Sequence, residues 1–144
     1  GTVGAEVIRL IEAQGRTLSA RSGRPVRVVA VTARSKAKKR GLDLRGLDWA
    51  KNPQALAEDP GIDCFVELMG GAGDPAFSAI ETALKAGKSV VTANKALIAK
   101  HGLRLAHAAE KGRHRRGFNA GLDADAGQQL RHGLQHLLGS KEQV

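Results

Sequence analysis

Three polar residues stand together in VTANKALIAKHG, residues 91–102, where an apolar run gives way to a helical pattern. Thr92 and Asn94 can hydrogen-bond a ligand or cap the following helix. Lys95 falls in the first turn of that helix, where the helix dipole disfavours a cation. A purely structural position there would favour Asp or Glu. We therefore expect Lys95 to hold a ligand.

A second candidate site is ELMGGAGDP, residues 67–75, at the end of another apolar run. Gly70 and Gly71 allow the backbone to approach a cofactor closely. Glu67 is either a functional acid or a buried carboxylate whose hydrogen bonds are satisfied within the protein. Asp74 and Pro75 predict a helix start, with Asp74 as its N-cap.

The opening residues GTVG predict a helix that begins directly after a glycine turn. Such a helix offers free N–H groups and a positive dipole end to a pyrophosphate. Gly1 and Gly4 have the spacing of the second and third glycines in the GxGxxG fingerprint, whose first glycine and strand would precede residue 1. An ordinary glycine cap explains the same residues equally well.

A basic segment follows the apolar run VRVVAVT, residues 26–32, and contains no carboxylate before Asp43. In dinucleotide-binding folds an acidic residue here holds the ribose 2′-hydroxyl, whereas an arginine accommodates a 2′-phosphate. Arg34 therefore favours a phosphorylated ribose. Considered alone, a solvated basic loop is the commoner explanation of such a charge run.

These candidate sites need strands and helices to bring them together. Apolar runs predict strands at 26–32, 63–69 and 88–93, and periodicity predicts helices at 53–59, 75–86 and 95–111. A further helix follows GTVG, with Gly15 as its expected stop and Leu18 as an alternative extension of its apolar face. Gly112 is the expected stop of the last helix. Continuous apolar strands that alternate with helices indicate an α/β fold with a parallel sheet covered on both faces.

Composition limits the classes of function. The chain has 144 residues, a single cysteine, 3% aromatic residues and a formal net charge of +9. One domain with a real core is expected, in a reducing, cytoplasmic setting. No apolar run has the length of a membrane span, and the five histidines form no metal-binding pattern. We therefore expect no metal and no membrane partner.

Taken together, GTVGAEVIRLIE, the basic segment, and ELMGG followed by VVTANKALIA resemble the N-terminal region of homoserine dehydrogenase of the monofunctional type. The resemblance covers residues 1–112 and implies a Rossmann-like, NAD(P)-binding domain with flanking helices. The first strand of that domain would be missing from this chain. Residues 113–144 are expected to form a separate, atypical tail that is poorly packed or helical.

The resemblance also implies an activity, the NAD(P)H-dependent reduction of L-aspartate 4-semialdehyde to L-homoserine in threonine, methionine and isoleucine biosynthesis. NADP is the expected cofactor, with NAD as the alternative. Lys95 is the implied catalytic residue, and the full-length family implies a homo-oligomer with a small-molecule substrate and no nucleic acid. The residues implied at the cofactor are Gly1, Thr2, Val3, Gly4, Arg34, Gly70, Gly71, Thr92 and Lys95.

The tail departs from the family pattern. GFNAGLDADAG stands where the family has a strand and a glycine-rich turn, and Asn119 replaces a glutamate of a monovalent-cation site. The substrate domain has no counterpart, so we expect this chain alone to be inactive. Two alternatives stay open, a basic nucleic-acid-binding module, which lacks a recognition motif, and a non-functional remnant.

Overall fold

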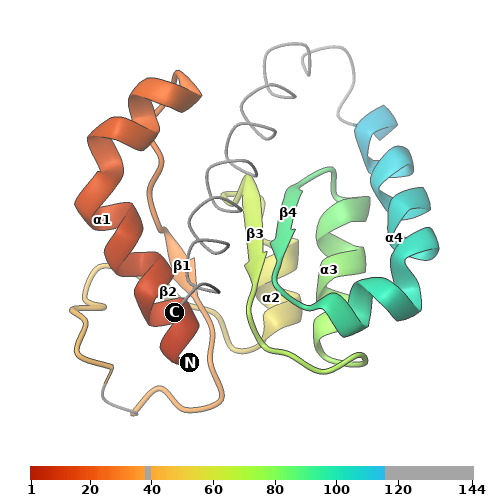
Figure 1. Cartoon of the computed structure of the whole chain (residues 1–144), viewed down its shortest axis with the longest axis horizontal. Helices are drawn as coiled ribbons and strands as arrows, with labels where there is room; N and C mark the ends of the chain where they lie inside the picture. Colours follow the sequence, from red (N-terminus) through yellow and green to blue (C-terminus); the bar gives the residue numbers. More distant parts are fainter. Residues whose placement is uncertain (38–39, 116–144) are drawn as a thin grey trace, which may run out of the picture.

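The computed structural model describes residues 1–37 and 40–115, in which helices and parallel strands form an α/β fold (Figure 1). The predicted fold class is therefore confirmed. In chain order the elements are α1 (Thr2–Ser22), β1 (Ala30–Val31), β2 (Asp48–Trp49), α2 (Pro53–Glu58), β3 (Cys64–Glu67), α3 (Ala76–Lys85), β4 (Ser89–Thr92) and α4 (Lys95–Arg115).

The strands form two separate parallel pairs, β1 with β2 and β3 with β4. In the doubly wound strand order 3-2-1-4-5-6, two such pairs correspond to strands 3 and 2 and to strands 4 and 5. No strand within the described residues takes the place of strand 1. The expected single sheet is therefore replaced by two separate two-stranded sheets.

The ladders are shorter than the apolar runs that predicted them. Only Ala30 and Val31 of the run 26–32 pair with a neighbour, because β2 is just as short. The strand β2 was not predicted, since Asp48 and Trp49 lie in a loop-like sequence without an apolar run. A strand's length is set by its hydrogen-bonding neighbours as well as by its own sequence.

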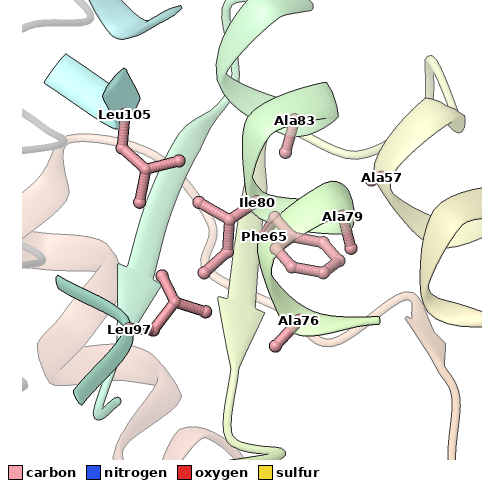
Figure 2. Packing of buried hydrophobic residues seen from close by; sticks show 8 residues of the cluster. All are labelled: Ala57, Phe65, Ala76, Ala79, Ile80, Ala83, Leu97 and Leu105. Carbon is pink, nitrogen blue, oxygen red and sulfur yellow. The ribbon is translucent and has the colours of Figure 1, made fainter. Parts of the chain in front are cut away.

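The hydrophobic core lies between β3 and the helices α2, α3 and α4 (Figure 2). The helix α3 turns small side chains at helical spacing toward Phe65 of β3, and its Ile80 is 1% exposed. Leu97 and Leu105 close the core from the α4 side. Other members of the cluster are Ala57, Ala76, Ala79 and Ala83.

Two predicted helix ends are wrong. The helix α1 does not stop at Gly15; it continues past a kink at Gln14 and ends at Gly23, whose φ of 69° is left-handed. The helix α4 does not stop at Gly112 but includes it. A Cβ at Gly112 would lie 1.9 Å from the carbonyl oxygen of Leu84, so this glycine allows close helix packing.

The start of α3 also differs from the prediction. Pro75 is the N-cap, and the helix begins one residue later, at Ala76. Asp74 still binds the first turn, since its carboxylate accepts hydrogen bonds from the amide and the hydroxyl of Ser78. These hydrogen bonds, and more weakly the charge of His101, lower the pKa of Asp74.

None of the helices in the described part of the chain combines the length and the apolar character needed to span a bilayer.

Candidate functional site

The first turn of α1, the loop after β3 and the corner between β4 and α4 lie at one end of the molecule, where the strands have their carboxyl ends (Figure 1). A Cβ built on Gly4 would lie 4.0 Å from a methyl carbon of Leu68, so α1 begins directly beside the end of β3. Ligands of open α/β sheets bind at this end of the strands. The structure thus brings together the three segments around Gly4, Gly70 and Lys95.

Glu67, the last residue of β3, is at the centre of this region and is 1% exposed. One carboxylate oxygen accepts hydrogen bonds from the amides of Met69 and Gly70. The other accepts a bond of 2.6 Å from the hydroxyl of Thr92, on the neighbouring strand. Of the two interpretations of Glu67, the structure therefore shows the carboxylate satisfied within the protein.

Asn94 connects the loop after β3 to the start of α4. Its side-chain oxygen accepts from the amide of Leu97 at 3.1 Å, which caps the helix. Its side-chain nitrogen donates to the carbonyl oxygen of Gly71 at 2.6 Å. The backbone N–H of Asn94 donates to the hydroxyl of Thr92 at 3.0 Å. Thr92 and Asn94 therefore organise the backbone of the candidate site.

His101 adds a contact that the sequence analysis missed, because histidines were considered only as metal ligands. Its Nε2 lies 3.0 Å from the carbonyl oxygen of Ala72, and its ring centroid lies 4.2 Å from that of Phe77. His101 follows Asn94 at a spacing of two helical turns, so both face the loop after β3. That spacing is the signal by which the sequence could have identified it.

The glycines of the loop are required by backbone conformation. Gly70 and Gly71 have φ angles of 75° and 84°, in the left-handed region that favours glycine. A Cβ on Gly70, Gly71 or Gly1 would meet no atom within 4 Å. Open space therefore borders the backbone at the start of α1 and in the loop after β3.

The first turn of α1 has no side-chain cap and no acidic residue. Its leading N–H groups have no partner within the helix, and the helix dipole adds positive potential there. Gly1, Thr2, Val3 and Gly4 thus present the arrangement that suits a pyrophosphate. The residues at this end of the molecule fit a dinucleotide.

The basic segment after β1 folds back on the protein. The Nζ of Lys36 and the guanidinium carbon of Arg40 lie 5.5 and 5.9 Å from the ring centroid of Trp49. The guanidinium of Arg9, in α1, donates to the carbonyl oxygen of Arg40 at 3.0 Å. The charges of Lys36 and Arg40 therefore serve structure as well as any ligand. Arg34 is exposed at its start.

Lys95 is the exposed first residue of α4. It lies beside the corner that Thr92 and Asn94 organise, and Ile98 in the same turn is 46% exposed. Lys95 therefore stands at the same end of the strands as Gly70 and Gly71, whereas Arg34 follows the other strand pair.

Most of this chain is similar to known proteins. Residues 1–119 match the family profile described as homoserine dehydrogenase, NAD binding domain. Homoserine dehydrogenase of Corynebacterium glutamicum is 46% identical over 112 residues, which are 76% of this chain and 24% of the relative. That of Mycobacterium bovis is 42% identical over 110 residues, with the same shares covered.

Solved structures give the same result. The crystal structure of a homoserine dehydrogenase from Thiobacillus denitrificans matches with a TM-score of 0.71 and 38% identity, over 78% of this chain and 26% of that chain. The enzyme from S. aureus matches with a TM-score of 0.69 and 33% identity, over 78% of this chain and 29% of that chain. The chain thus spans about a quarter of the length of the curated relatives it matches.

Proposed function

The chain belongs to the homoserine dehydrogenase family, and on that premise we propose that it forms the cofactor-binding part of an enzyme that reduces L-aspartate 4-semialdehyde to L-homoserine. The observation that carries the proposal is the match of residues 1–119 to the family's NAD-binding domain. The match supports a nicotinamide cofactor. We expect the complete enzyme to be a cytoplasmic homo-oligomer with a small-molecule substrate, as the resemblance implies.

Each segment of the site has a role in this proposal. The first turn of α1 binds the pyrophosphate through its backbone N–H groups. Gly70 and Gly71 leave room for the nicotinamide end of the cofactor, which supplies the hydride when bound. The ammonium group of Lys95 attracts the aldehyde oxygen, on which negative charge develops during reduction. The chain's own contribution is thus to hold two reactants in one orientation.

We further propose NADP rather than NAD as the cofactor, because Arg34 follows β1 and no carboxylate is available for a ribose 2′-hydroxyl. We propose a cofactor-binding domain of residues 1–112 with residues 113–144 outside it, although α4 continues across this boundary to Arg115. Residues 116–144, including Asn119, lie outside the described part of the chain.

The test is calorimetric titration of the 144-residue chain with NADPH and with NADH. We expect NADPH to bind more tightly, and Arg34→Ala to weaken NADPH by a factor of about 10 to 100 with little effect on NADH, since one charge-assisted contact is lost. Arg27→Ala is the matched control, because Arg27 is also exposed but precedes β1. Failure of the unmodified chain to bind either nucleotide would overturn the proposed function, and equal weakening of both would overturn the NADP assignment.

A further inference from the structure

Four successive residues of the loop after β3 have a backbone group bound by a side chain. The amides of Met69 and Gly70 donate to Glu67. The carbonyl oxygens of Gly71 and Ala72 are bound by side chains of Asn94 and His101, respectively. A loop with two consecutive left-handed glycines has many alternative conformations when free, and ordering it costs conformational entropy. In this protein each of residues 69–72 is instead held by a hydrogen bond to a side chain.

Glu67 is the residue that connects the two sides of this arrangement. One of its oxygens binds the loop, and the other accepts from the hydroxyl of Thr92. The hydroxyl of Thr92 accepts in turn from the backbone amide of Asn94, and the side chain of Asn94 caps α4. Since Glu67 is 1% exposed, it reaches the site only through these partners. It holds the loop and the start of α4 in one relative position.

The loop lies on the path expected for one half of a dinucleotide. Arg34 follows β1, in the strand pair away from Glu67, and the first turn of α1 lies beside Leu68, the first residue after β3. If the ribose phosphate lies at Arg34 and the pyrophosphate at α1, the remaining half extends over residues 69–72. The adenosine half would then have no contact that depends on Glu67.

We propose that Glu67 is a positioning residue for the nicotinamide half of the bound cofactor, acting through residues 69–72 and Thr92. The inference rests on the proposed function for the identity of the ligand. Its basis is that a loop fixed before binding spares the ligand the cost of ordering it. Glu67 thereby affects one half of the cofactor and leaves the other half unaffected.

The experiment compares two ligands on the 144-residue chain, NADPH and 2′,5′-ADP, which contains only the phosphorylated adenosine half. In Glu67→Gln we expect the Kd of NADPH to rise about tenfold, because a charge-assisted acceptor is lost. The Kd of 2′,5′-ADP should stay within about twofold, since no direct contact is changed. An unchanged NADPH affinity, or an equal loss for both ligands, would contradict the proposal.

Glu81→Gln is the matched control. Glu81 also binds two partners through its carboxylate, but it lies on α3 and contacts Lys85 and Arg104. We expect its substitution to change neither Kd. Should Glu67→Gln not fold, as judged by circular dichroism, Thr92→Val removes the bond to Glu67 together with the acceptor for the backbone amide of Asn94. It should then give the same selective loss, and an equal loss for both ligands would again contradict the proposal.

A chain that binds neither nucleotide would contradict the proposed function, and the positioning role is then measured without ligand. Amide hydrogen exchange by NMR at residues 69–72 and at Asn94 should be faster in Glu67→Gln or Thr92→Val and unchanged in Glu81→Gln. Unchanged exchange in the loop would show that Glu67 does not hold it, whatever the chain binds.

Discussion

The ammonium group of Lys88 donates to the carbonyl oxygens of Asp59 and Ile62, and only 6% of this residue is exposed. A lysine is rarely buried unless its charge is paired or hydrogen-bonded. Lys88 directly precedes β4, and its hydrogen bonds connect the start of that strand to the turn before β3. Position 88 in the sequence looks like the polar start of a strand, because its burial depends on a turn that is distant along the chain.

We expect Lys88→Met to lower the free energy of unfolding by about 2–4 kcal/mol, since it removes the hydrogen bonds that a charged donor makes to two backbone carbonyl groups. Lys85→Met is the control, because Lys85 forms an exposed i,i+4 ion pair with Glu81. That change should cost less than about 0.5 kcal/mol. Urea denaturation measures both, and equal effects would show that the buried bonds carry no special stability.

The site residues were predictable from the sequence to different degrees. Gly70, Gly71 and Lys95 were identified as candidates by their position after predicted strands, and the structure places them at the same end of the molecule. The partners of Glu67 and His101 could not be predicted, since nothing in a sequence shows which backbone amide or carbonyl of a loop a given side chain reaches. The roles proposed for Lys95 and Arg34 stay predictions.

At the scale of the elements, the contact between α3 and α4 depends on Gly112. Its position would place a Cβ 1.9 Å from the carbonyl oxygen and 3.0 Å from the carbonyl carbon of Leu84, which are backbone atoms of another helix. We expect Gly112→Ala to destabilise the fold by about 1–3 kcal/mol or more, because the helices must separate. Thermal unfolding followed by circular dichroism measures this change.

Gly102→Ala provides the control in the same helix. A Cβ there would lie 3.8 Å from a methyl carbon of Ile98, an ordinary contact, so alanine should stabilise α4 by up to about 1 kcal/mol. The same substitution is thus expected to have opposite effects at two positions of one helix. A stabilising Gly112→Ala would show that the contact with Leu84 is looser than described.

Glu81 joins the same two helices through charge. Hydrogen bonds from Arg104, then from Lys85, lower the pKa of Glu81 below its ordinary value of 4.5. Because the pKa is lowered in the folded state, the stabilisation is complete above pH 4.5 and is lost as the pH falls through the folded value. Both cations are more than half exposed, so the contribution is small.

We therefore expect Glu81→Gln to lower the melting temperature at pH 7 and to have a smaller effect at pH 3, where the carboxylate of the unmodified protein is increasingly protonated. Thermal unfolding at several pH values measures the difference between the two proteins. A difference that is constant between pH 7 and pH 3 would contradict the assigned role of the carboxylate.

Helix ends were the least predictable feature of the elements. Gly15 and Gly112 are of the residue type that commonly ends a helix, but both lie inside helices. A glycine ends a helix when its φ is left-handed, as at Gly23 and Gly87, and neither sequence position nor spacing distinguishes these from the others. At Gly112 the deciding factor is a neighbouring helix, which no local pattern reveals.

At the scale of the whole molecule, the order of elements followed from the sequence more completely than their pairing. Apolar runs predicted β1, β3 and β4 and their parallel direction, because each is joined to the next by a helix or a long crossover. The two-residue ladder of β2 and the division into two strand pairs depend on contacts between distant segments. The segments of the candidate site converge because parallel strands have their carboxyl ends on one side.

Turnover depends on how much of the enzyme's chain is present. The chain spans 24% of its Corynebacterium glutamicum relative, and hydride transfer requires cofactor, aldehyde and proton donor to be held together. We expect the isolated 144-residue chain to show no oxidation of NADPH in the presence of aspartate semialdehyde, as measured by absorbance. Turnover on the order of 10 per second, an ordinary enzyme rate, would contradict this expectation.

The glycine contact between α3 and α4 also limits how the length of the chain can vary. The helix α4 is fixed at its start by the cap of Asn94 and near its end by the packing of Gly112 on Leu84. These two points are about 27 Å apart along the helix, and each inserted or deleted residue would rotate one relative to the other by about 100°. Exposed positions between them, such as Leu103, which is 76% exposed, can accept many side chains. An insertion or deletion between them would turn Gly112 away from Leu84 or Lys95 away from the strand ends.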